Sequence, residues 1–236
     1  MREMSVCITV KNRSRATCSR KPLTLLPNCL RSLNRSLSQL GIDAEVIITD
    51  FHSDDWPLRE WVPGMFGENL CGGKWGGAGV VEHTIIDIDG DFNRGKGRNA
   101  AARAATGRVL FFLDADMIVS PDTIAAGSMA APGSAVFPLV WEYRDQEHTD
   151  FAQLPCGTGN CFVSRESYVK TWGWHEFGKW GFEDWGFMVT VSNYDTIFRP
   201  NIPTFIHQWH PDTMRDQYDR GKWSNANGTQ NGIRTV

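Results

Sequence analysis

The chain has 236 residues, of which 41% are hydrophobic and 22% are charged, a balance that excludes intrinsic disorder and suits one folded domain. Its 24 Lys and Arg residues against 27 Asp and Glu residues give a net charge of −3, which excludes nucleic-acid binding by bulk positive charge. No long apolar run predicts a membrane span, the start lacks the apolar core of a secretion signal, and the six cysteines include no C-x-x-C pair. We therefore expect a cytoplasmic protein with neither a membrane span nor a nucleic-acid partner.

The first half of the chain predicts strands that alternate with helices. Apolar runs typical of buried strands occur at 5–10, 45–49, 80–87 and 108–113. A helix after the first strand is indicated by apolar residues spaced three or four apart, which are Leu26, Leu30, Leu33, Leu37 and Leu40, and Gly41 ends it. The alanine-rich segment 98–106 predicts a second helix after a polar loop at 87–97.

The second half is less regular. Ser120-Pro121 begins a helix, further helices are expected at 165–171 and 183–193, and strands are expected at 134–141, 159–164 and 202–207. The order predicts an α/β protein with a single mixed, mostly parallel sheet flanked by helices. We expect one domain over 1–220, in which 1–117 forms a nucleotide-binding half and 118–220 an acceptor and catalytic half, and a mobile tail over 221–236.

Charged side chains follow several of these strands. Asp114-Ala115-Asp116 comes directly after the most apolar strand, and two carboxylates there suit Mg²⁺ or Mn²⁺. Lys11 and Arg13 follow the first strand, and a second basic group, Arg94, Lys96 and Arg98, follows the third. Parallel strands bring these loops to one edge of the sheet, where Arg and Lys beside a divalent ion would bind phosphate. The alternative is a set of solvated loops in which an Asp caps the next helix.

Four segments in one order resemble a known family. These are Lys11-Asn12-Arg13, Phe92-Asn93-Arg94-Gly95-Lys96 with Asn99, Asp114-Ala115-Asp116, and Trp180-Gly181-Phe182-Glu183-Asp184. Over about residues 5–210 the chain resembles a GT-A fold glycosyltransferase, of the β-1,4-galactosyltransferase type and the related family 2 enzymes, including chondroitin-polymerase domains. The resemblance implies a UDP-sugar donor, Mn²⁺ or Mg²⁺, and a glycan, protein or lipid-linked acceptor.

The resemblance also implies roles for single residues. Lys11 and Arg13 would contact the nucleotide or its phosphates, Phe92 and Arg94 would flank the uracil and ribose, and Asp50 would contact the base. Asp114 would contact the ribose or a metal-bound water, and Asp116 would bind the metal. Trp180 and Gly181 would shape the donor-sugar and acceptor sites, and we expect Trp180 and Trp174 to stack on sugar unless they pack under a loop.

Asp184, which ends the Glu183-Asp184 pair, would be the catalytic base. Direct displacement at the anomeric carbon needs a carboxylate that deprotonates the incoming hydroxyl. Trp180 and Trp185 provide an apolar setting, in which burial would raise the pKa of Asp184. The plain alternative is that both acids begin a helix, where the macrodipole favours negative charge.

A histidine near the end of the last strand would complete the metal site. His207 and His210 both occur in the segment Ile-His-Gln-Trp-His-Pro, and imidazole suits Mn²⁺. We prefer His207 because His207-Gln208 resembles the chondroitin-polymerase pattern. Galactosyltransferases have a Met ligand three residues before this His, and Thr204 stands there instead.

Three other functions remain open. A retaining enzyme like those that transfer GalNAc to polypeptides is disfavoured, since those relatives carry Asn at the position of Asp184. A nucleotidyltransferase that makes the nucleotide-sugar usually has a glycine-rich loop after the first strand, and residues 11–21 contain no glycine. A non-catalytic nucleotide-sugar-binding module would not need Asp114, Asp116, Asp184 and a histidine together.

Overall fold

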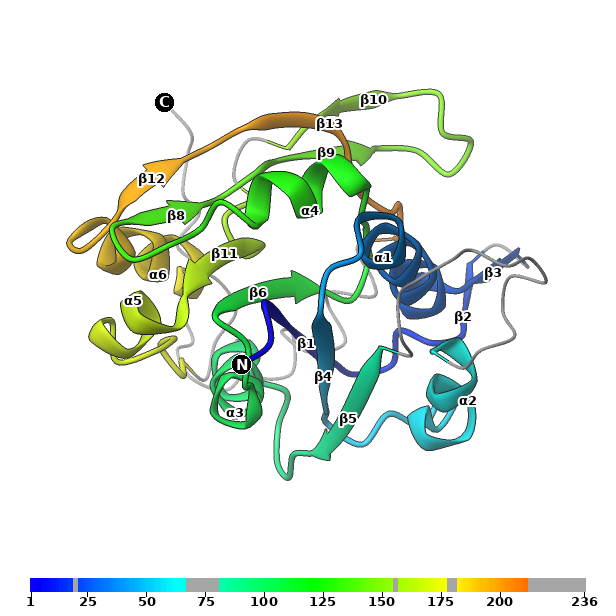
Figure 1. Cartoon of the computed structure of the whole chain (residues 1–236). Helices are drawn as coiled ribbons and strands as arrows, with labels where there is room; N and C mark the ends of the chain where they lie inside the picture. Colours follow the sequence, from blue (N-terminus) through cyan, green and yellow to red (C-terminus); the bar gives the residue numbers. More distant parts are fainter. Residues whose placement is uncertain (19–20, 67–80, 155–156, 178–181, 212–236) are drawn as a thin grey trace, which may run out of the picture.

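The structure is a computed structural model that describes residues 1–18, 21–66, 81–154, 157–177 and 182–211 (Figure 1). Most of the glycine-rich segment 64–79, the residues Trp180 and Gly181, Cys156 and the tail 221–236 lie outside these ranges. Among the described residues, no helix combines the length and apolar character needed to cross a bilayer.

A seven-stranded sheet forms the centre of the molecule, in the order β12-β8-β11-β6-β1-β4-β5. Its strands are β1 (Met4–Val10), β4 (Ala44–Asp50), β5 (Glu82–Asp87), β6 (Val109–Asp114), β8 (Ser134–Val136), β11 (Cys161–Ser164) and β12 (Thr196–Phe198). Strands β5, β4, β1 and β6 are mutually parallel, whereas β11 runs antiparallel to both β6 and β8. The predicted mixed, mostly parallel sheet with flanking helices is confirmed.

The expectation of a single sheet is wrong, because two smaller sheets accompany the large one. Strands β10 (Phe151–Gln153), β9 (Leu139–Tyr143), β13 (Asn201–His207) and β7 (Met117–Ile118) form the second sheet, and β2 (Ala16–Cys18) pairs with β3 (Lys21–Leu23). The predicted strand 134–141 is divided between two sheets as β8 and β9. Pro138 stands at the division, where it has no N–H to donate to a ladder.

Helices cover both faces of the large sheet (Figure 1). On one face, α1 (Leu25–Leu40), α2 (Leu58–Met65) and α4 (Pro121–Gly127) share one apolar cluster with alternate residues of β1. On the other face, α3 (Arg94–Ala104) and α6 (Glu183–Ser192) bury alanine and aromatic side chains against β6, with Tyr168 of α5 (Arg165–Lys170) packed at the edge. The predicted leucine face of α1 is confirmed from Leu26 to Leu37, and Gly41 ends the helix at a positive φ of 65°.

Helix α3 begins four residues before the predicted start at 98. The side chain of Asn93 accepts a hydrogen bond from the backbone N–H of Lys96 and so caps the helix. Gly95 and Gly97 make the first turn look like a loop, but both are needed for close packing. A Cβ on Gly95 would lie 2.0 Å from the carbonyl oxygen of His175, and one on Gly97 would lie 2.3 Å from Thr9 Cγ2.

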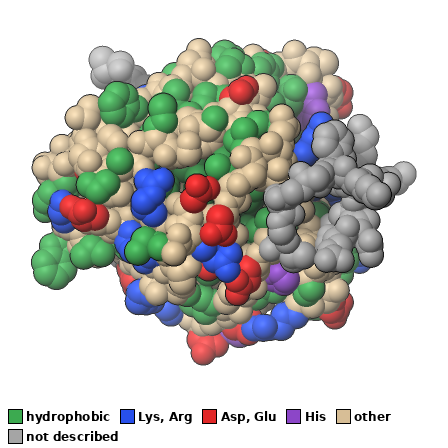
Figure 2. Space-filling model, in the orientation of Figure 1, with side chains coloured by type: hydrophobic (Ala, Val, Ile, Leu, Met, Phe, Trp, Pro, Cys, Tyr) green, Lys and Arg blue, Asp and Glu red, His purple; other side chains and the backbone are tan. Residues whose placement is uncertain are grey.

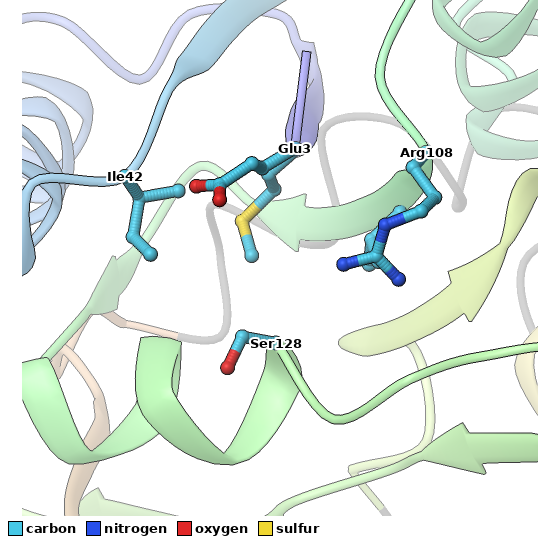
Figure 3. A pocket seen from close by; sticks show the side chains of 6 residues that line it. Glu3, Ile42, Arg108 and Ser128 are labelled. Carbon is cyan, nitrogen blue, oxygen red and sulfur yellow. The ribbon is translucent and has the colours of Figure 1, made fainter. Parts of the chain in front are cut away.

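The two edges of the large sheet differ in chemistry. At the amino ends of β1 and β6, a cavity of about 250 Å³ is lined by Glu3, Met4, Ile42, Arg108, Val109 and Ser128 (Figure 3). The acids and bases singled out by the sequence follow the carboxyl ends of the same strands. On the face drawn in Figure 2, acidic and basic side chains are interspersed. Ligands of open α/β sheets bind beyond the carboxyl ends of the strands, so this edge is where a site for a charged ligand is expected.

Candidate active site

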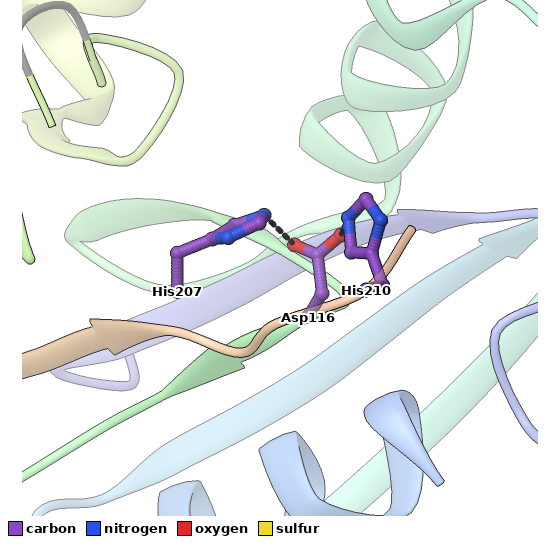
Figure 4. Close-up of side chains that lie close together, drawn as sticks. All are labelled: Asp116, His207 and His210. Atoms are coloured by element: carbon purple, nitrogen blue, oxygen red, sulfur yellow. Dashed lines mark ion pairs between the residues drawn. The ribbon is translucent and has the colours of Figure 1, made fainter. Parts of the chain in front are cut away.

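Asp116 and two histidines form a compact group of potential metal ligands (Figure 4). The Nε2 atom of His207 lies 3.7 Å from one carboxylate oxygen of Asp116, and the Nε2 atom of His210 lies 3.4 Å from the other. The ligand atoms of the three residues all lie within 4.8 Å of one another. The sequence favoured His207 without excluding His210, and the structure brings both to Asp116.

Strand pairing explains how residues 91 positions apart meet. Strand β7 follows Asp116 directly and pairs antiparallel with β13, so that Met117 lies opposite His207. The backbone N–H of Gln208 then donates a hydrogen bond to the carbonyl oxygen of Asp116, with N and O 2.8 Å apart. Two side-chain hydrogen bonds of Gln208, with Asn28 and with the Leu25 carbonyl, attach this end of β13 to α1.

The surroundings of Asp116 keep its carboxylate charged. Burial tends to raise the pKa of Asp116, but the charges and hydrogen bonds of His207 and His210 outweigh it and hold the pKa well below its ordinary value. Arg13, from the loop after β1, adds a positive charge, with its Nε atom 3.9 Å from a carboxylate oxygen of Asp116. The predicted meeting of the first basic loop with the Asp-Ala-Asp segment at one edge is confirmed.

Asp114 points to a different partner, Arg98. An Nη atom of Arg98 lies 2.8 Å from Asp114 Oδ1, and the other lies 2.5 Å from Asp184 Oδ1. The Asp-Ala-Asp segment and the proposed base Asp184 therefore lie on the same side of the molecule, joined by one guanidinium. The arginine itself is only 1% exposed. Since Arg98 is itself buried and its donors face the partly buried carboxylates of Asp114 and Asp184, it does not match the expectation that it binds phosphate.

The expected direction of the Asp184 pKa is wrong. Burial does tend to raise it, but the charges of Arg98 and Arg94 and the hydrogen bond from Arg98 outweigh burial and lower the pKa below its ordinary value. Asp184 is therefore ionised at neutral pH, so that its carboxylate is free to accept a proton. Asp184 and Glu183 also occupy the first turn of α6, as the helix-start alternative predicts, and the two readings are compatible.

Helix α3 presents a second arginine to the same acids. Arg94 and Arg98 are four residues apart and so lie on one face of the helix. The Nε atom of Arg94 lies 3.4 Å from Glu183 Oε1, while the other carboxylate oxygen of Glu183 is buried without a hydrogen bond. Lys96, on another face, donates from Nζ to the backbone carbonyl of Asp89.

The residues that we expected around the nucleobase of the donor follow the carboxyl ends of β4 and β5. Asp50 ends β4 and accepts hydrogen bonds from the backbone N–H and the hydroxyl of Ser53, at 3.0 and 2.6 Å. The ring of Phe92 packs edge-on against Phe51, with centroids 5.3 Å apart. Lys11 follows β1 at the same edge.

The expectation that Trp174 stacks on a sugar is wrong. Its side chain is 3% exposed, its ring stacks on Phe187 with centroids 3.8 Å apart, and the guanidinium of Arg98 lies 4.2 Å from its centroid. Trp174 is therefore a core residue that lies against Arg98. The other expected sugar contacts, Trp180 and Gly181, lie outside the described residues.

The sequence assigned no individual role to three residues that organise the site, although Asn99 belongs to one of the four segments that resemble the family. Asn160 accepts from the backbone N–H of Asp114 and donates to its carboxylate, at 2.7 and 3.1 Å. Asn99 holds Trp174 through hydrogen bonds to its backbone N–H and carbonyl, at 2.8 and 2.9 Å. A Cβ on Gly159 would lie 2.7 Å from Asp184 Oδ2. For Asn160 the available signal was its place directly before the apolar strand β11, and for Asn99 it was its place in the resembling segment.

Solved structures that superpose on this chain include glycosyltransferases with the GT-A fold. The chain superposes on TarS of Staphylococcus aureus with a TM-score of 0.61 and 13% identity, over 87% of this chain and 60% of that one. It also superposes on the catalytic domain of Drosophila β1,4-galactosyltransferase 7, with a TM-score of 0.59 and 14% identity, over 98% of this chain and 82% of that one. The fold is therefore the GT-A fold that the sequence motifs resemble.

Sequence comparison points the same way. Residues 82–127, which run from β5 into α4, match the model of glycosyl transferase family 2. Human chondroitin sulfate N-acetylgalactosaminyltransferase 2 is 28% identical over 160 residues, which cover 57% of this chain. The match spans only 30% of that human protein, and the mouse protein of the same name matches equally.

Proposed function

We propose that this protein is a metal-dependent, inverting glycosyltransferase, which moves a sugar from a UDP-sugar to an acceptor hydroxyl with Asp184 as the general base. One observation carries the proposal: a carboxylate-and-imidazole group and a separate, charged carboxylate lie at the same edge of a GT-A fold. The structures that resemble this chain include TarS with UDP-GlcNAc, a mannosyltransferase of Pyrobaculum calidifontis with GDP-Man and Mn²⁺, and a galactosyltransferase variant with manganese and UDP-Gal.

The donor set suits a divalent transition metal. One carboxylate and two imidazoles, with ligand atoms within 4.8 Å of one another, match the oxygen and nitrogen ligands that Mn²⁺ accepts. Three protein ligands leave coordination positions for diphosphate oxygens. When bound, the ion would stabilise the negative charge of the leaving diphosphate. Arg13, beside Asp116, would add a second positive charge on that side.

Asp184 would act on the acceptor. Its carboxylate takes the proton of the acceptor hydroxyl as that oxygen forms a bond to the anomeric carbon. The bond from the anomeric carbon to the diphosphate oxygen breaks, and UDP leaves with the electron pair. Because attack and departure occur on opposite faces of the sugar, the configuration inverts. Asp50, Phe92 and Arg94 would hold the nucleotide, and UDP-GalNAc is the first donor to test, because the human and mouse relatives are named for N-acetylgalactosamine transfer.

Two variants test this assignment with Mn²⁺ and a panel of UDP-sugars. Asp116→Ala should lose Mn²⁺-dependent UDP binding and sugar transfer together. Asp184→Asn should still bind UDP with Mn²⁺ but lose turnover by about 10²–10⁴-fold, the usual contribution of a general base. Binding is measured by calorimetry and transfer by UDP release, with Asp122→Asn on the exposed start of α4 as the matched control.

Near-normal turnover in Asp184→Asn would show that another group is the base. Retention of configuration in the product, read by NMR, would favour the retaining alternative. Pyrophosphate formed from UTP and a sugar 1-phosphate would point to a nucleotidyltransferase. Tight UDP binding without transfer or hydrolysis of any donor would show that the protein is a non-catalytic nucleotide-sugar-binding module.

A further inference from the structure

We propose that Arg98 is a positioning residue that holds the general base Asp184 and couples it to the donor side of the site through Asp114. The inference rests on the proposed function, because it takes Asp184 as the base. Arg98 is buried, and its two side-chain ion pairs are with Asp114 and Asp184, so we argue its effect on the reaction from these two carboxylates.

The contacts of Arg98 are divided between the two sides. One Nη atom bonds to Asp184 at the start of α6, and the other bonds to Asp114 at the end of β6, two residues before Asp116. A planar guanidinium fixes the angle between its donors, so the position of one carboxylate determines where the other is bound. A shift of Asp114 on donor binding would therefore move Asp184.

The guanidinium also lies against an aromatic ring. Its Cζ atom is 4.2 Å from the centre of the Trp174 ring, which Asn99 and Phe187 hold in turn. Asn160 holds Asp114 by two hydrogen bonds. Gly159 leaves just enough room, since a Cβ there would lie 2.8 Å from an Nη atom of Arg98.

A contribution to the stability of the fold does not explain why a charged arginine is buried between Asp114 and Asp184. One buried cation lies between two carboxylates, and buried ion pairs are often no more stable than apolar residues of the same volume. Loss of the arginine would instead leave two carboxylates facing a shared space, where repulsion would push Asp184 from its place. A misplacement of about 1 Å in a catalytic group costs about 100-fold in rate.

The experiment compares three variants in the assay of UDP-sugar transfer with Mn²⁺. Arg98→Met keeps an apolar stem, Arg98→Lys keeps the charge without the fork, and Arg103→Met makes the same change at an exposed position of α3. We expect Arg98→Met to lose about 100-fold in kcat, with a smaller loss of affinity for UDP with Mn²⁺, because the two hydrogen bonds from Asn160 still hold Asp114 on the donor side. Arg98→Lys should lose less, and Arg103→Met should behave as wild type.

Chemical rescue separates positioning from a loss of packing. Guanidinium chloride, well below unfolding concentrations, should restore part of the kcat of Arg98→Ala, whereas urea, of the same shape but uncharged, should not. The inference would be overturned if guanidinium and urea had equal effects. It would also be overturned if Arg98→Met kept the wild-type kcat; should that variant fail to fold, the same test applies to Arg98→Lys. If the wild type transfers sugar and Asp184→Asn does not, such a result counts against Arg98 alone; an inactive wild type or an active Asp184→Asn counts against the proposed function.

Discussion

Asp50 is a buried carboxylate whose surroundings disfavour its charge. Burial raises its pKa above the ordinary value of 3.8, and nearby Asp87 raises it further, although the two hydrogen bonds from Ser53 act in the opposite direction. The folded protein therefore binds a proton more readily at Asp50 than the unfolded chain does. Its contribution to the free energy of unfolding becomes less favourable as the pH rises from 3.8 through the folded-state pKa, and it stays unfavourable at neutral pH.

Asp50→Asn should consequently raise the free energy of unfolding at pH 7, because the amide oxygen can still accept both hydrogen bonds from Ser53. The gain should disappear near pH 3, where the wild-type carboxyl is protonated in both states. Urea unfolding at the two pH values measures it, and a variant that is less stable at pH 7 would contradict the account. If Asp50 contacts the base, the same variant should bind UDP more weakly.

Helix α3 is the element on which the site most depends. It places Arg94 and Arg98 against Glu183 and Asp184, and it can do so only because it lies close to β1 and β4. The approach is closest at Gly97, where an added Cβ would lie 2.3 Å from Thr9 Cγ2 and 2.9 Å from Thr49 Oγ1. The two threonine hydroxyls are hydrogen-bonded to each other at 3.0 Å, so neither can move without cost.

Gly97→Ala should therefore destabilise the protein by about 1–3 kcal/mol, as overpacking of a core does, although Ala is the better helix former. Gly64→Ala in α2 is the matched control, because nothing lies within 4 Å of the added Cβ there. That variant should be neutral or stabilised by up to about 1 kcal/mol. Urea unfolding compares the two, and equal effects would show that α3 can shift away from the sheet.

At the scale of the whole molecule, the site joins stretches that are far apart in the chain. Arg13, Arg98, Asp116 and Asp184 come from four different segments, and His207 arrives on a strand of the second sheet. A metal held by Asp116 and the two histidines would bind only the folded chain. Its binding free energy would therefore add to the stability of the entire fold.

Mn²⁺ at a hundredfold excess over its Kd should add about 2.7 kcal/mol of stability, which corresponds to about 5–10 °C in Tm for a chain of this size. His207→Asn and His210→Asn should each weaken Mn²⁺ binding by more than about 10-fold, because both imidazoles face Asp116. His148→Asn, an exposed histidine between β9 and β10, is the control. If one of the first two variants keeps wild-type affinity, that histidine is not a ligand.

The sequence by itself determined the local structure and the edge at which the site lies. Strands β1, β4 and β6 follow from short, continuous apolar runs, which are typical of strands buried on both faces. Helix α1 follows from leucines spaced three or four apart, which form its buried face. Parallel strands then bring their following loops together, so the meeting of the first basic loop with Asp116 could be predicted without coordinates.

The tertiary structure alone decided which partner each charged or aromatic side chain has. Arg98 was expected to face phosphate and instead lies buried between Asp114 and Asp184, and Trp174 was expected at a sugar and instead lies in the core. The two contacts of Arg98 join residues 16 and 86 positions apart, and no local pattern carries that information. The pKa of Asp184 depends on the same partners: burial raises it, but two arginines from another helix reverse the direction.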